Sequence, residues 1–248
     1  MVMELPAYPD PDVLLARLVQ IQSTVLSRET GLPMDGLPPI PMLQPPTEEF
    51  LRSLGQRLGM QSHDLFLVAG LAIPDDTLRF DERAGRELPE LVEGVISLPA
   101  PARQRVRDCA QSLAEVPQTV LPRVQRPYEQ YPPGFGALLV RMLALRNLGW
   151  SSAAQVMYLM SGVYVSAATI GAVGRGVREL DAELLTGFAA VLGVPVAVLA
   201  SLTGMRQSVA SRRLSAEVVD TAALLWDVRH LTAGQVRQVS QLANASGG

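Results

Sequence analysis

Few side chains in this chain are of the types that catalyse reactions. The two histidines, His63 and His230, lie far apart in the sequence, and neither belongs to a recognisable set of nucleophile, base and carboxylate. Each has an acidic residue nearby, Asp64 and Asp227 respectively, and we expect both pairs to be polar contacts on helix surfaces. The single cysteine, Cys109, lies among apolar residues of an amphipathic segment, which favours a buried thiol over a nucleophile. We therefore do not expect an enzyme.

Arginine supplies all 21 strongly basic side chains, because the chain has no lysine. A phosphate-binding loop of the nucleotide-binding type requires a lysine, and the glycines of GAVGRG, from Gly171, have the wrong spacing for a dinucleotide-binding loop. No cofactor is therefore expected, and one cysteine cannot form a thiolate zinc cluster. Four arginines of the second half remain as candidate contacts to a polyanion, and these are Arg141, Arg146, Arg175 and Arg178.

Charge is distributed unevenly between the two halves. Residues 1–124 contain 11 arginines and 17 acidic residues, whereas residues 125–248 contain 10 arginines and 7 acidic residues. A mildly basic second half is suited to meeting a polyanion, and the acidic first half is a candidate surface for a protein partner. Ordinary scatter of surface charge explains the same imbalance equally well.

The composition, with 48% apolar and 18% charged residues among 248, is typical of a soluble globular protein. The first 20 residues carry acids and prolines where a signal peptide has a basic start and an apolar run, so we expect a cytoplasmic protein. The run from Leu184 to Met205 has no charged residue and is long enough to span a bilayer. Because Gly193 and Pro195 interrupt it in the manner of a turn between two short helices, we expect no membrane segment.

Part of the chain is repeated. The segment TEEFLRSLGQRLGMQSHDLFLVAGL, from Thr47, resembles DAELLTGFAAVLGVPVAVLASLTGM, from Asp181, with six identities at an offset of 134 residues. The segments that begin at Leu98 and Leu231 also match, at an offset of 133, and a third match lies upstream of both. The pattern predicts two related helical modules.

Helical periodicity predominates, so we expect an all-α fold of about ten to twelve helices. The predicted domains are an N-terminal module at 11–115, a second domain at 135–205 and a C-terminal helical pair at 206–245. In the first module the stretch GLPMDGLPPIPMLQPP has too many prolines for a regular helix. That module is therefore predicted to lack the two elements that the second carries at 151–175.

Residues 137–204 resemble the DNA-binding domain of the Cro/repressor-like helix-turn-helix regulators, the XRE family, in its actinobacterial form. The resemblance implies a five-helix bundle of the lambda-repressor type within the second module. The matching pieces are an amphipathic helix ALLVRMLALRNLG, a second helix SAAQVMYLM capped by Ser151 or Ser152, a turn at Gly162, a third helix over Val165–Val173 and a fourth helix capped by Asp181.

In this family the third helix lies in the major groove, and its early residues face base edges. The resemblance therefore assigns the DNA contacts of this chain position by position. None of the side chains placed to read bases is an arginine, asparagine or glutamine, so we expect weak discrimination between sequences. The assigned readers are Ser166, Ala167, Ala168, Thr169 and Gly171, with Ser152 at the start of the second helix and the four arginines named above on phosphates.

The resemblance implies a transcriptional regulator that binds double-stranded DNA, and four phosphate contacts give an affinity modest enough to favour a homodimer. A protein-interaction module of the same shape, without base-specific reading, is the alternative. A regulator that responds to a small molecule is a third possibility. Four aromatic residues bear on that possibility but are expected in the core rather than in a ligand pocket, and these are Trp150, Tyr158, Tyr164 and Trp226.

Overall fold

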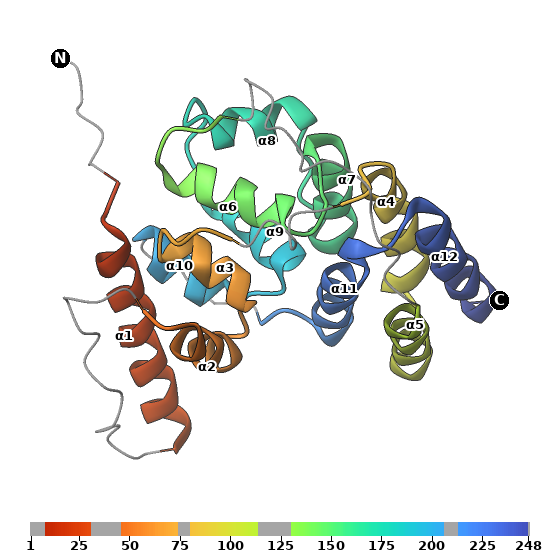
Figure 1. The fold of residues 1–248 in the computed structure, drawn as a ribbon, viewed down its shortest axis with the longest axis horizontal. Helices are drawn as coiled ribbons and strands as arrows, with labels where there is room; N and C mark the ends of the chain where they lie inside the picture. Colours follow the sequence, from red (N-terminus) through yellow and green to blue (C-terminus); the bar gives the residue numbers. More distant parts are fainter. Residues whose placement is uncertain (1–7, 31–45, 74–79, 114–129, 206–212, 248) are drawn as a thin grey trace.

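The computed structural model describes residues 8–30, 46–73, 80–113, 130–205 and 213–247. Every regular element in these residues is a helix, which confirms the expected all-α fold, and the twelve α-helices agree with the expected number. A short 3-10 helix, Val228–His230, follows the eleventh (Figure 1). The bounds are α1 Pro11–Thr30, α2 Glu48–Leu58, α3 Ser62–Val68, α4 Ala84–Ile96, α5 Ala100–Ser112, α6 Phe135–Ala144, α7 Trp150–Ser161, α8 Ala167–Gly174, α9 Ala182–Leu192, α10 Val196–Thr203, α11 Ala216–Asp227 and α12 Ala233–Gly247.

Local sequence signals set several helix starts. Thr47 caps α2 and Asp181 caps α9, because each side chain accepts a hydrogen bond from the backbone amide three residues on, at 3.2 and 2.8 Å. The cap predicted at Asp181 is therefore confirmed. The third helix of the predicted helix-turn-helix starts later than expected, at Ala167 instead of Val165, because Ser166 is its capping residue.

The uncharged run from Leu184 to Met205 forms two short helices, α9 and α10. Gly193 ends α9 with a φ of +69°, in the left-handed conformation that glycine adopts without strain. Pro195 immediately precedes α10. Within the part of the chain that the structure describes, no helix combines the length and the apolar character needed to cross a membrane.

Helices α6 to α10 form one bundle. Both α6 and α7 pack against α8 and against α9, and α10 packs against α9. Met157, Ile170 and Phe188 are fully buried between these helices. The position of α8 is thus set by two longer helices that hold its inner side.

The other helices extend this bundle in two directions (Figure 1). On one side α4 packs against α7 of the bundle, and it forms a group of four helices with α5, α11 and α12. On the other side α1 packs on α10, and α3 packs on α6. Buried apolar residues from all of these helices belong to one continuous hydrophobic core.

Corresponding helices stand in the same order in the two predicted modules. Helices α2 and α9 each have 11 residues, a capping side chain at the start and a glycine at the end. Helices α4 and α5 follow them in one module as α11 and α12 do in the other. The stretch predicted to replace α7 and α8 in the first module lies almost wholly outside the described residues, and the duplication itself stays a prediction.

Candidate nucleic-acid interface

Helices α7 and α8 are joined by a turn. Gly162 ends α7 with a φ of +74°, and residues 163–166 lead to α8. Ile170 and Val173 of α8 are fully buried, and Ala168 is exposed. The first turn of α8 therefore faces solvent while its inner side is fixed in the bundle.

Gly171 faces the bundle, which corrects its assignment as a base-reading residue. A Cβ atom at this position would lie 2.7 Å from the ring of Trp150, the first residue of α7. A larger residue would therefore push α8 away from α7. The sequence feature that could have indicated this contact is the glycine next to the apolar Ile170, because a glycine there permits close packing of two helices.

Trp150 and Tyr131, which precedes α6, hold the C-terminal end of α8. The Trp150 indole Nε1 donates a hydrogen bond to the Tyr131 hydroxyl at 2.8 Å. The exposed guanidinium of Arg175 lies over the Trp150 ring, with its carbon 5.3 Å from the centroid. The half-buried Arg141 donates to the carbonyl oxygen of Tyr131 at 3.1 Å. Two of the predicted phosphate-binding arginines thus meet at one aromatic pair, which the sequence pattern did not single out.

A further aromatic residue, Tyr8, packs beside the start of α6, near Arg141. Its ring packs edge-on against Phe135 at a centroid distance of 5.2 Å. Burial raises the pKa of the Tyr8 phenol above its ordinary value of 10.0, and the positive charge of Arg141 partly opposes this. The Tyr8 phenol is therefore neutral at neutral pH and does not offset the positive charge of the Arg141 guanidinium.

The two hydroxyl groups at the start of α8 bind each other. Ser166 Oγ accepts a hydrogen bond from the Thr169 amide at 3.1 Å and lies 3.0 Å from Thr169 Oγ1. Ala167 and Ala168, between them, offer only methyl groups. The predicted reading surface is therefore poor in hydrogen-bonding groups that are available to a base edge.

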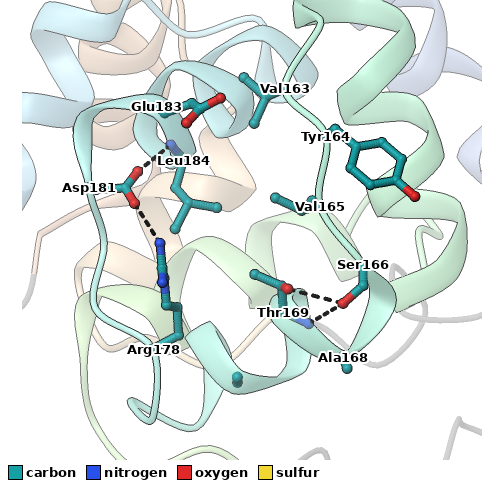
Figure 2. A pocket seen from close by; sticks show the side chains of 11 residues that line it. Val163, Tyr164, Val165, Ser166, Ala168, Thr169, Arg178, Asp181, Glu183 and Leu184 are labelled. Carbon is teal, nitrogen blue, oxygen red and sulfur yellow. Dashed lines mark hydrogen bonds and ion pairs between the residues drawn. The ribbon is translucent and has the colours of Figure 1, made fainter.

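An open hollow of about 520 Å³ lies beside the start of α8. Figure 2 shows its wall, formed by the turn before α8, one side of α8 and the loop into α9. Arg178 donates to Asp181 Oδ2 at 2.9 Å across this loop. Glu183 supplies a second carboxylate, so the charged side chains that line the hollow are one guanidinium and two carboxylates.

Arg146 is fully buried, and its assignment to a phosphate contact is wrong. Its guanidinium donates to both carboxylate oxygens of Asp64 at 3.0 and 2.8 Å. It also donates to the carbonyl oxygens of Met142 and Leu192 at 2.8 and 3.1 Å, so it joins α6 to α3 and α9. The expectation that Asp64 lies on a helix surface is wrong for the same reason.

Ser152 is buried too, which removes it as a DNA contact. Helix α7 already begins at Trp150, so neither Ser151 nor Ser152 caps it. The exposed side of α7 carries Ser151, Gln155 and Tyr158. Sequence reasoning missed Gln155, although the spacing of these three residues, by four and then three positions, is that of one helix face.

The histidines pack against aromatic rings. His63 lies 5.5 Å from Trp226, and His230 stacks on Phe80 at 5.3 Å, measured between ring centroids. The carboxylate three residues before His230 forms an ion pair with Arg107 of α5 at 2.6 Å. Both acidic neighbours of the histidines therefore have arginine partners from distant segments.

Two aromatic residues that we expected in the core lie on the surface. The exposed fractions of Tyr158 and Tyr164 are 54% and 84%, and their rings meet edge to face at 6.1 Å. Cys109, expected to be buried, is half-buried. The candidate interface thus has an aromatic pair beside the start of α8.

A scan against models of protein families finds no match to this chain, and searches of curated proteins and of solved structures find none either. The function proposed below rests on the residues and their geometry.

Proposed function

We propose that this chain is a transcriptional regulator that places α7 and α8 on double-stranded DNA. The observation that carries the proposal is the presentation of α8, which follows α7 after a turn and is held from inside by α6 and α7. In its first turn Ala168 is exposed and Ala167 and Thr169 are half-buried, and Arg175 is exposed at its other end. A helix presented in this way fits the major groove of B-DNA.

The proposed contacts fall into two groups. Arg175 is the arginine that we assign to a phosphate, with Arg141 beside it, and Arg178 is a weaker candidate because it is paired with Asp181. A small set of side chains at the start of α8 is proposed to touch base edges, chiefly through methyl groups. This set is Ser166, Ala167, Ala168 and Thr169.

The number of charged contacts supports a homodimer. The described part of the chain presents one helix of this kind. Two or three arginines around it give a low, salt-dependent affinity for DNA. Two chains on two half-sites would double both the phosphate contacts and the length of sequence read. We propose the acidic first half, residues 1–124, as the surface for the second chain or for another protein.

Fluorescence anisotropy with labelled fragments of genomic duplex DNA tests the proposal. At about 50 and 200 mM salt, the association constant is expected to fall as salt rises, by a little less than one power of the salt ratio per phosphate contact. The folded state of the protein is checked by circular dichroism in the same buffers. Absence of binding at the lower salt, with the helices intact, contradicts the proposal.

A protein-interaction role is the second candidate, and the exposed aromatic pair favours it. Tyr158, Tyr164 and Val177 are large apolar residues with exposed fractions of 54%, 84% and 78%. In a deletion strain complemented with variants, this role predicts that Tyr164→Ser abolishes function and that Arg175→Ala preserves it. The regulator proposed above predicts loss of function for Arg175→Ala.

A further inference from the structure

Asp181 has two partners, one on each carboxylate oxygen. Oδ1 accepts the backbone amide of Leu184 at 2.8 Å and thereby caps α9. Oδ2 accepts a hydrogen bond from Arg178 at 2.9 Å (Figure 2). One side chain therefore fixes the start of a helix and restrains a basic residue of the proposed DNA-binding surface.

The pair is accessible to a polyanion. The side chains of Arg178 and Asp181 are 58% and 45% exposed, and both line the hollow beside α8. A phosphate that approached Arg178 there would also meet the carboxylates of Asp181 and Glu183. Because like charges repel and the guanidinium already has an anionic partner, phosphate binding at Arg178 is weakened.

We infer that Asp181 is a positioning residue that limits the affinity for DNA by holding Arg178 in an ion pair. This removes much of one sequence-independent contact, so that binding depends more on the fit of α8 in the groove than on charge. The inference rests on the proposed function and adds a residue that sets the balance between specific and non-specific binding.

Asp181→Asn separates the two roles of the side chain. Asparagine caps helices as well as aspartate does, so the bond to the Leu184 amide is kept, while the negative charge that holds Arg178 is lost. The probe is a labelled random-sequence DNA duplex, since it reports contacts that do not depend on sequence. We expect roughly fivefold tighter binding at about 100 mM salt, and a salt dependence steeper by about one phosphate contact.

Two matched variants show whether Asp181 acts through Arg178. Arg178→Ala alone is expected to weaken binding by less than about twofold, and in its presence Asp181→Asn is expected to bring no gain. Glu183→Gln removes the same charge from the same hollow but leaves the ion pair of Arg178 in place. The increase in DNA affinity for Glu183→Gln comes only from the lower negative charge near the DNA and is expected to stay under about twofold.

The outcomes are distinct. A gain for Asp181→Asn that disappears in Asp181→Asn/Arg178→Ala supports the inference, provided that the melting temperatures of both variants match the wild type. The inference is overturned if Asp181→Asn binds no tighter than Glu183→Gln, or if its gain persists without Arg178. If neither the wild type nor any variant binds at low salt, the proposed function has failed instead.

Discussion

Arg146 and Arg175 are the same residue type in opposite surroundings. Arg146 is enclosed and matched by Asp64, 82 positions away in the sequence, whereas Arg175 is exposed over Trp150. The resemblance to helix-turn-helix regulators placed both on phosphates. The partner of Arg146 is contributed by another part of the chain, and no local pattern indicates such a partner.

Replacing Arg146 by methionine is expected to lower the free energy of unfolding by about 3–5 kcal/mol, because the Asp64 carboxylate is left buried without its counter-charge. Urea denaturation measures the change. Arg178→Ala, which breaks an exposed pair, is the control and is expected to cost under about 1 kcal/mol. Equal stabilities for the two variants would show that the buried ion pair contributes no more to the free energy of unfolding than the exposed one.

The raised pKa of the Tyr8 phenol leads us to expect a loss of stability in alkaline solution. Burial raises the pKa of its phenol above 10.0, so between the unfolded and folded pKa values the folded state keeps a proton that the unfolded chain has lost. The resulting stability is present below the unfolded pKa and is lost as pH rises through the folded pKa. Melting temperatures measured between about pH 9 and 11 are expected to fall more steeply for the wild type than for Tyr8→Phe. Parallel curves would contradict this.

At the scale of the helices, the close approach of α6 to α8 is one of the contacts that position the proposed reading helix. A Cβ atom on Gly136 of α6 would lie 2.9 Å from the carbonyl carbon of Val173 in α8. Real side chains do not approach a backbone atom so closely. The spacing of α6 and α8 therefore depends on the absence of a side chain at Gly136.

Gly136→Ala is expected to lower stability by about 1–3 kcal/mol, because the clash outweighs the better helix propensity of alanine. By moving α8 it is also expected to weaken DNA binding. Gly234→Ala in α12 is the control, since the nearest atom to its Cβ would be Thr232 Oγ1 at 3.9 Å. Thermal unfolding and the anisotropy titration report both effects. A Gly136→Ala protein as stable as the control would show that α6 and α8 separate without cost.

Helix starts and ends show which local features were predictable. The cap at Asp181 and the turn at Gly193 were both expected, since a capping carboxylate and a left-handed glycine act within a few residues. The start of α7 at Trp150 was missed by two or three residues, because no side chain caps it. The contact between Gly171 and Trp150 was missed because it depends on how two helices cross.

For the whole molecule, periodicity was sufficient to predict an all-α fold, whereas the packing of helices on one another was not predictable. The two modules read from the repeat are not packed separately: α1 lies on α10, α3 on α6, and α4 on α12. Each of these contacts joins a helix of one predicted module to a helix of the other. They bury the faces that a repeat pattern alone leaves without partners.

The proposed homodimer predicts the stoichiometry of the complex. At saturation, analytical ultracentrifugation with a labelled duplex that contains a selected genomic site is expected to show two chains per duplex. A half-site duplex is expected to bind one chain with clearly lower affinity, because the contacts of the second chain are lost. One chain per full-length duplex, bound as tightly as on the half-site, would contradict the homodimer.

The most direct test of the central claim compares the DNA affinity of the wild type, Arg175→Ala and Arg237→Ala at low salt. Arg237 is an exposed arginine of α12, paired with Glu87, and controls for the loss of one positive charge elsewhere. If α8 lies on DNA, Arg175→Ala is expected to weaken binding about tenfold on all sequences and to reduce the salt dependence by about one phosphate contact, with Arg237→Ala unchanged. Equal affinities for the three proteins would contradict the placement of DNA on α7 and α8.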